Sequence, residues 1–371
     1  MMVNGCKQKK WVVKIGSSLV TNNGLGLDLE SMRIWVQQII QLRDQGCQVV
    51  LVSSGAVAEG VSRLGLKQRP TQVHMQQAAA AIGQMGLVHA YEVNFAEQAV
   101  STAQVLLTHD DLADRTRYLN ARSTLSSLLD LGVVPVVNEN DTVATAELCL
   151  GDNDTLSALV ANLINADTMV ILTDQAGLMS ADPAVDKGAS LIQSGDANDD
   201  GLMSLAGAGG ALGRGGMKTK LAAAKRAARS GTDTVIANGR QPEVLTRIFK
   251  GESIGTKLSA NSEPVTARKQ WLANGIIAKG EIVVDEGAQR ALIGLGKSLL
   301  AVGIQTVSGH FVRGDLVVCS NAQGFEIARG LVNYNSSEVH QLVGATSDEY
   351  LSKLGYKGDD EIIHRDNLVL A

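Results

Sequence analysis

Apolar runs of strand length alternate with segments of helical period from Trp11 to about Lys250. Most runs are unbroken, as expected of parallel strands that helices cover on both faces. The pattern therefore predicts a three-layer α/β/α sandwich around a mostly parallel sheet. The predicted strands are Trp11–Ile15, Val49–Val52, Ala103–Leu107, Val133–Val137, Thr168–Leu172 and Thr234–Ala237, and the predicted helices include Asp28–Leu42, Gln76–Ala81 and Leu221–Ala228.

A second domain is predicted after Gly255, where the sequence becomes polar and contains Pro264. Short β-type runs separated by glycines follow, which is typical of a small barrel-like domain. We expect a first domain over residues 1–258, a linker over 259–274 and a small C-terminal β-barrel-like domain over 275–371. The β-type runs are Glu281–Val284, Leu299–Val302, Leu316–Cys319 and Glu326–Arg329.

Composition limits the class of protein. The chain has 371 residues, of which 45% are hydrophobic, and its 33 basic and 38 acidic side chains give a net charge of −5. It can bury a large core, and no basic excess indicates a nucleic-acid or membrane partner. Its four cysteines are scattered, and no apolar run approaches the ~18 residues of a membrane span. We expect a cytoplasmic protein that is not exported.

Small and charged residues follow the first two predicted strands. Lys14-Ile15-Gly16-Ser17-Ser18 brings a lysine and small residues to the carboxyl edge of the sheet, and Ser53-Ser54-Gly55-Ala56 leads into a helix. Backbone amides at such turns can hold a phosphate or a carboxylate. A solvated loop explains the first motif equally well, and a structural turn explains the second.

Two polar clusters follow the fourth strand. Asn138-Glu139-Asn140-Asp141 comes directly after an apolar run, and Gly151-Asp152-Asn153-Asp154 stands at a predicted helix start. Ligands bind in the loops at the carboxyl ends of strands in open α/β sheets, so both clusters indicate a site. An Asx-turn is the alternative for the first cluster. Helix capping would explain only one residue of the second cluster. The carboxylates could hold Mg²⁺, bind a substrate ammonium or orient lysines.

The remaining motifs indicate a nucleotide. Thr173-Asp174 follows the fifth strand, and Gly213-Arg214-Gly215-Gly216-Met217-Lys218-Thr219-Lys220 leads into the helix predicted to begin at Leu221. Glycines, lysines and a helix N-terminus together favour phosphate binding, with a flexible linker as the alternative. The loop is not a Walker A sequence, so a P-loop ATPase is excluded. Metal-ligand histidine spacing and a serine-hydrolase elbow are also absent from the sequence.

These motifs, in this order, strongly resemble the amino-acid kinase superfamily over nearly the whole chain. The pair N-E-N-D and G-D-N-D is similar to the branch that phosphorylates the side-chain carboxylate of glutamate. Residues from about 275 to 355, including Gly280-Glu281-Ile282-Val283-Val284, resemble a PUA domain. The resemblance implies transfer of the γ-phosphoryl group of ATP, with Mg²⁺, to glutamate as the first step of proline biosynthesis, and inhibition by proline.

The resemblance also implies roles for individual residues. Lys14 and Lys220 would neutralise the transferring phosphoryl group, and Asp154 would orient them. Ser54, Asp141 and Asn153 would hold glutamate. The ATP site would comprise Lys14, Thr173, Asp174, Arg214, Gly215, Gly216, Met217, Lys218, Thr219 and Lys220, and no residue is assigned to a metal. Arg214 and Lys218 depart from the small or hydroxyl residues expected of the family, and their charge would either tighten ATP binding or face solvent.

Two alternatives stay open beside this reading. A related kinase could act on acetylglutamate, aspartate or a nucleoside monophosphate, although acetylglutamate has no ammonium for Asp141 to bind. PUA-like domains can also bind RNA, but the 8 basic and 12 acidic residues from Gly275 to Ala371 give a net charge of −4, so no nucleic-acid partner is expected. By analogy with the superfamily, we expect a homodimer or homotetramer.

Overall fold

The computed structural model describes residues 8–22, 24, 26–144, 153–181, 186, 188–206, 216–260 and 278–370. The chain divides into two compact units, one mainly of residues up to Pro264 and the other mainly of residues from Val265. Within the described residues, no helix is both long enough and apolar enough to cross a membrane. The residue boundaries predicted for the two domains and for their linker are not tested and remain predictions.

The first unit is built on an eight-stranded sheet with the order β3-β4-β2-β1-β5-β7-β8-β6. Its neighbouring strands are parallel except β7 and β8, so the predicted mostly parallel sheet is confirmed. The strands are β1 (Lys10–Ile15), β2 (Gln48–Ser53), β3 (Thr102–Leu107), β4 (Val134–Glu139), β5 (Thr168–Thr173), β6 (Ser194–Asp196), β7 (Asp233–Asn238) and β8 (Thr256–Ser259).

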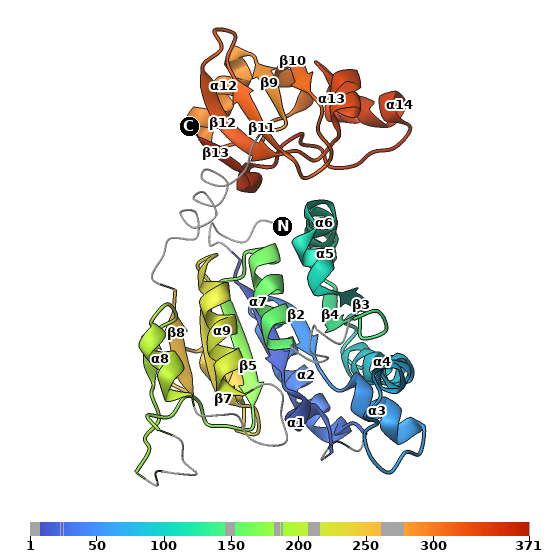
Figure 1. The fold of residues 1–371 in the computed structure, drawn as a ribbon, viewed down its shortest axis with the longest axis vertical. Coiled ribbons are helices and arrows are strands. Elements are labelled where there is room, and N and C mark those ends of the chain that lie inside the picture. The colour runs from blue at the N-terminus through green and yellow to red at the C-terminus, as the bar shows by residue number, and fades with distance from the viewer. Residues whose placement is uncertain are drawn as a thin grey trace. The chain divides into compact units, whose positions relative to one another are not determined.

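Helices cover both faces of this sheet (Figure 1). The helices between residues 17 and 249 are α1 (Ser17–Val20), α2 (Leu29–Asp44), α3 (Ala56–Arg63), α4 (Val73–Ala96), α5 (His109–Ala113), α6 (Arg115–Asp130), α7 (Asn153–Ile164), α8 (Asp200–Leu205), α9 (Met217–Ala228) and α10 (Val244–Phe249). The expected Asp28–Leu42 helix is α2, and the Asp28 side chain caps it by accepting a hydrogen bond from the Ser31 backbone N–H.

The alternation of side chains along β1 assigns its two faces. Val13 and Ile15 share a hydrophobic core with Trp35 and Ile39 of α2, and the same core includes Leu245 of α10. Successive side chains on a strand point to opposite faces. The intervening side chains, including that of Lys14, therefore face the other layer, where α7 and α9 pack against the sheet.

The second unit contains a five-stranded sheet with the order β10-β9-β11-β12-β13. It has its own buried core, which includes Phe311, Val317, Tyr334 and Tyr350. The strands are β9 (Gly280–Val284), β10 (Ile304–Gly309), β11 (Leu316–Ser320), β12 (Glu326–Leu331) and β13 (Leu368–Leu370). The helices are α12 (Glu286–Leu295), α13 (Ser336–Leu342) and α14 (Tyr350–Leu354), with 3-10 turns η1 (Ala301–Gly303), η2 (Ser347–Glu349) and η3 (Arg365–Asn367).

One predicted strand of this unit is wrong. Residues Leu299–Val302 were expected to form a strand, but only an isolated bridge joins Leu299 to Ile363, and the chain then turns through η1. Gly303 approaches Ala288 of α12 so closely that an added Cβ would lie 2.4 Å from the Ala288 Cβ. This packing against a helix favours a tight turn over an extended strand.

Candidate active site

The candidate active site lies where four neighbouring parallel strands end. The sheet order places β4, β2, β1 and β5 side by side, and their carboxyl ends carry Glu139, Ser53, Ile15 and Thr173. Residues from four separate sequence motifs therefore meet at one edge of the sheet, as expected of ligand sites in open α/β folds.

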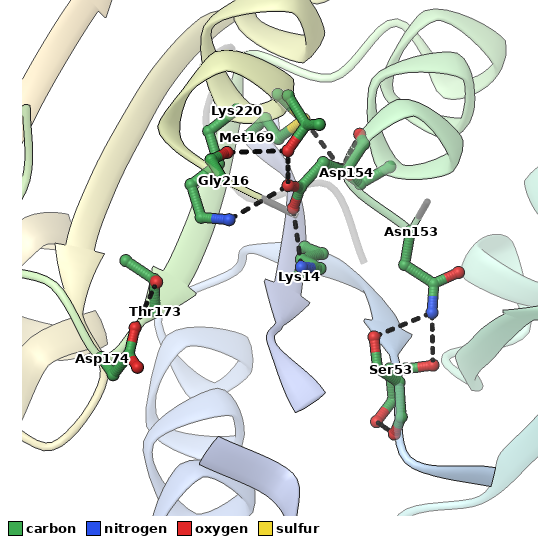
Figure 2. A network of polar contacts seen from close by, with 12 residues as sticks. Lys14, Ser53, Asn153, Asp154, Met169, Thr173, Asp174, Gly216 and Lys220 are labelled. Carbon is green, nitrogen blue, oxygen red and sulfur yellow. Dashed lines mark hydrogen bonds and ion pairs between the residues drawn. The ribbon is translucent and has the colours of Figure 1, made fainter. Parts of the chain in front are cut away.

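Asp154 contacts both of the expected catalytic lysines. Its Oδ1 lies 2.6 Å from Lys14 Nζ and its Oδ2 lies 3.1 Å from Lys220 Nζ. Thr219 Oγ1 also donates to Asp154 Oδ2, at 2.8 Å. Figure 2 shows the Asp154 carboxylate between the two ammonium groups. The structure thus brings together β1, the first turn of α7 and the first turn of α9.

Burial makes these charges strongly interdependent. Lys14 and Lys220 are each 5% exposed and Asp154 is 2% exposed. Burial alone would raise the pKa of Asp154, but the ammonium groups of Lys14 and Lys220 lower it to about 2. Burial lowers the pKa of Lys220, and the Asp154 carboxylate opposes that effect. Two ammonium groups share one carboxylate, and this excess of formal positive charge suits an anionic ligand.

Ser54 and Asn153 form a second group. Asn153 Nδ2 donates to Ser54 Oγ at 2.9 Å and lies 3.2 Å from the Ser53 carbonyl oxygen. The chain can turn from Ser54 into α3 because Gly55 has a φ of 111°, in the left-handed region that glycine favours. The structure therefore joins two of the three residues expected to hold an acceptor substrate.

Asp141, the third of these residues, lies in the turn after β4 and is half-buried. Burial raises its pKa to about 6, although the positive charge of Arg69 acts in the opposite direction. The strand β4 extends to Glu139, so Asn138 and Glu139 belong to the strand and not to the loop that the sequence suggested.

The residues expected to hold ATP are only partly described. Thr173 Oγ1 donates to Asp174 Oδ1 at 3.1 Å, and Figure 2 shows this pair on the opposite side of Lys14 from Ser53 and Asn153. Met217 is buried, and Lys218 is exposed. Arg214 and Gly215 lie outside the described residues.

The helix expected to begin at Leu221 begins earlier. Met217, Lys218, Thr219 and Lys220 form the first turn of α9, with Gly216 at the N-cap position. The preceding glycines suggested a loop, but methionine and lysine have good helix propensity and Met217 is buried. This first turn of the helix places Thr219 and Lys220 against Asp154.

Three buried polar residues beside this site had no individual role predicted from the sequence, although Asn138 belongs to the predicted N-E-N-D cluster. Asn138 Oδ1 accepts from Asn153 Nδ2 at 3.0 Å, and Asn138 Nδ2 donates to Gln84 Oε1 at 2.8 Å. Tyr91 Oη lies 2.8 Å from Ser53 Oγ. Gln84 is the single polar residue in the run Ala78–Gly86, and this position was the available signal in the sequence. A buried glutamine needs hydrogen-bond partners.

Comparisons with known proteins identify two families along the chain. The model of the amino acid kinase family matches residues 9–238, and the PUA domain model matches residues 280–354. A solved structure of UMP kinase from Bacillus anthracis covers 68% of this chain and 97% of its own, with 16% identity and a TM-score of 0.49. Family membership rests on the family models and on the sequence relatives.

Those relatives are similar over almost their whole length. The glutamate 5-kinase of Nitrosospira multiformis is 57% identical over 365 residues, covering 98% of both chains. The glutamate 5-kinase of Herminiimonas arsenicoxydans is 58% identical over 363 residues, again with 98% of both chains covered. The chain therefore belongs to the amino acid kinase family, is an ATP-dependent kinase and carries a PUA domain.

Proposed function

We propose that this protein phosphorylates the side-chain carboxylate of L-glutamate, producing L-glutamyl 5-phosphate and ADP. The name of relatives that are 57% and 58% identical over 98% of the chain supports this substrate. The structural observation that carries the reaction type is the contact of Lys14 and Lys220 with the single carboxylate of Asp154. Two buried ammonium groups at one edge of the sheet suit a phosphoryl group in transfer.

The proposed reaction needs no protein nucleophile. An oxygen of the glutamate side-chain carboxylate forms a bond to the γ-phosphorus, and the bond from that phosphorus to the β–γ bridging oxygen breaks. The attacking carboxylate is already ionised near neutral pH, so no base has to remove a proton. The protein's task is to align the two substrates and to stabilise charge on the transferring group.

Each group of residues has a proposed task in this reaction. Lys14 and Lys220 neutralise the phosphoryl oxygens, and Asp154 orients both ammonium groups. Ser54, Asn153 and Asp141 bind glutamate, with the Asp141 carboxylate opposite the substrate ammonium. The proposed ATP-binding residues are Thr173, Asp174 and the segment from Arg214 to Lys220.

A magnesium ion that arrives with ATP is part of the proposal. Within the described residues, no three His, Cys, Asp or Glu side chains are grouped as metal ligands. Mg²⁺ commonly binds through substrate phosphates, waters and one or two carboxylates, and Asp174 could supply one such carboxylate. When bound, Mg²⁺ would neutralise charge on the ATP phosphates.

Regulation and assembly complete the proposal. We infer that proline inhibits the enzyme, which would place the reaction at the first step of proline biosynthesis, and that the enzyme assembles as a homodimer or homotetramer. The predictions of a cytoplasmic location and of no nucleic-acid partner for the PUA domain are kept. Salt-sensitive, submicromolar RNA binding by the full chain would contradict the second of these predictions.

A substrate panel tests the proposed reaction. Purified protein is incubated with MgATP and glutamate, acetylglutamate, aspartate or a nucleoside monophosphate, and acyl phosphate is trapped with hydroxylamine while ADP is measured. We expect hydroxamate with glutamate and less of it when proline is added. Faster turnover of another acceptor would contradict glutamate as the substrate, and ADP formation without hydroxamate would contradict a carboxylate acceptor.

A further inference from the structure

A line of three buried amides connects α4 to the proposed acceptor pocket. Asn153 Nδ2 donates to Asn138 Oδ1 at 3.0 Å, and Asn138 Nδ2 donates to Gln84 Oε1 at 2.8 Å. Gln84 is 8% exposed, Asn138 is 3% exposed and Asn153 is 2% exposed. Their hydrogen bonds therefore form with little competition from water, which makes the orientation of each amide energetically important.

The contacts of Asn153 fix which of its amide atoms is available to a ligand. Its Nδ2 faces three acceptors, which are the Ser53 carbonyl oxygen, Ser54 Oγ and Asn138 Oδ1. A reversed amide would place an oxygen against the Ser53 and Asn138 oxygens. Asn153 Oδ1 is buried and has no hydrogen-bond partner within the described residues. An unpaired buried acceptor is costly, so this atom suits a donor from a ligand, such as an ammonium group.

The orientation of Asn138 depends in turn on Gln84. Asn138 Oδ1 accepts from the Glu139 backbone N–H at 2.9 Å as well as from Asn153. Gln84 Oε1 is the acceptor that faces Asn138 Nδ2. Without Gln84 Oε1, Asn138 Nδ2 would lose this acceptor. The three hydrogen-bonded amides would then have one restraint fewer on their orientation.

The same helix contacts the pocket at a second point. Tyr91 follows Gln84 by seven residues, a spacing that places both on one face of α4. Tyr91 is fully buried, and its Oη lies 2.8 Å from Ser53 Oγ. Helix α4 thus holds the ends of β4 and β2, from which Asn138 and Ser53 reach Asn153.

We propose that α4 positions the acceptor pocket, with Gln84 acting through Asn138 and Tyr91 acting through Ser53. The inference rests on the proposed function, because Asn153 and Ser54 are taken to bind the acceptor substrate. Gln84 and Tyr91 are positioning residues and do not contact the phosphoryl group. Loss of either side chain's hydrogen bond should weaken binding of the acceptor while leaving ATP binding and the chemical step almost unchanged.

Gln84→Met tests this role with a close match in side-chain length. We expect the KM for glutamate to rise about tenfold, because the Asn153 amide is less restrained, with kcat and the KM for ATP within about twofold of the wild type. Gln38→Met is the matched control. Gln38 is also buried and hydrogen-bonded, but its partners are Ile34 of α2 and Leu245 of α10. This control should lose thermal stability without a change in KM.

Tyr91→Phe provides a second test that keeps the buried ring. We expect it to raise the KM for glutamate about threefold and to leave the KM for ATP unchanged. Its control is Tyr350→Phe, since Tyr350 is a buried tyrosine of the second unit that donates to the Asp360 carbonyl oxygen. A wild-type KM for glutamate in Tyr91→Phe and in folded Gln84→Met would overturn the proposal. So would equal changes in kcat and in both KM values.

Failure of the proposed function would look different from failure of this inference. If the wild-type enzyme used another amino-acid acceptor, the substrate assignment would be wrong, and the variants would be compared by their KM for that acceptor. A selective rise in that KM would still support positioning by α4. Calorimetric titration of each folded variant with the acceptor, in the presence of a non-hydrolysable ATP analogue, should give the same order of affinities without turnover.

Discussion

At the residue scale, the buried contacts of Asp154 explain how two lysine side chains can be buried next to each other. Burying an ammonium group away from water is unfavourable unless an opposite charge and hydrogen bonds compensate for the lost hydration. Asp154 supplies that charge to Lys14 and Lys220, with distances of 2.6 and 3.1 Å. The same contacts hold both ammonium groups in place before a phosphoryl group arrives, so little reorganisation is needed during the reaction.

Replacing Lys220 should therefore affect the chemical step most. We expect Lys220→Met to lower kcat by about 10² to 10³ and to change the KM for glutamate by less than about threefold, because its charge matters most during phosphoryl transfer. Lys225→Met is the matched control on the same helix, since Lys225 is 40% exposed and pairs with Asp200. Steady-state kinetics measure kcat and the KM for glutamate of both variants. A wild-type kcat in Lys220→Met would contradict the assigned role.

Asp141 should make glutamate binding depend on pH. Its pKa is raised to about 6 by burial, so the carboxylate gains a proton, and loses its negative charge, as pH falls through that value. If the ionised form binds the substrate ammonium, the KM for glutamate should rise about fourfold between about pH 7.5 and about pH 5.5. Glutamate's own groups do not titrate in this range.

The Asp141→Asn variant separates this effect from the titration of ATP. It should have a higher KM for glutamate at neutral pH and a KM that no longer rises toward low pH. Both proteins are assayed with the same saturating MgATP at every pH. A parallel rise of KM in the two proteins would show that a group other than Asp141 is responsible.

At the element scale, two helices approach each other through glycines. An added Cβ on Gly83 of α4 would lie 1.9 Å from the Ala56 carbonyl oxygen of α3, and one on Gly60 of α3 would lie 1.7 Å from the Ala79 carbonyl oxygen. The two backbones are thus in direct contact. Because α3 follows Ser54 directly, this packing also sets the position of the Ser54 turn relative to Gln84 and Tyr91.

Two glycine substitutions on α4 should consequently have different effects on the free energy of unfolding. Gly86→Ala would meet the ends of the Arg63 and Glu59 side chains, which can move, so helix propensity should leave stability unchanged or raise it by up to about 1 kcal/mol. Gly83→Ala would meet backbone atoms of α3 and should lower the free energy of unfolding by about 1 to 3 kcal/mol. Denaturant unfolding measures the free energy of unfolding of both variants. Equal stability would contradict backbone contact between α3 and α4.

The sequence predicted the strands of the sheet better than the boundaries of its helices. Long apolar runs identify buried parallel strands, which is why β1, β2, β4, β5 and β7 were found within two residues. The strands β6 and β8 are short and lack such a run, so they were missed. The hydrogen bond between Gln84 and Asn138 could not be predicted, because these residues are 54 positions apart and only tertiary packing brings them together.

At the scale of the whole molecule, one hydrophobic core in the first unit and one in the second are separate from each other. One core combines residues from Trp11 to Ile254, and the other combines residues from Ile282 to Ile363. Neither core takes a residue from the other, so each has the interior that an independent folding unit needs. The change to a polar, proline-containing sequence after Gly255 indicated this division. The helices of the second unit were not predicted.

Calorimetry of the full chain should therefore resolve two unfolding transitions. Phe311 is fully buried in the second core, and Phe311→Ala should lower the stability of that transition by about 3 to 5 kcal/mol. Phe325→Ala makes the same chemical change at a side chain that is 70% exposed, and should shift neither transition measurably. MgATP should raise only the other transition, because a ligand stabilises the unit that binds it. If Phe311→Ala lowered both transitions equally, or if MgATP raised both, the two units would unfold as one and the separate cores would not define independent domains.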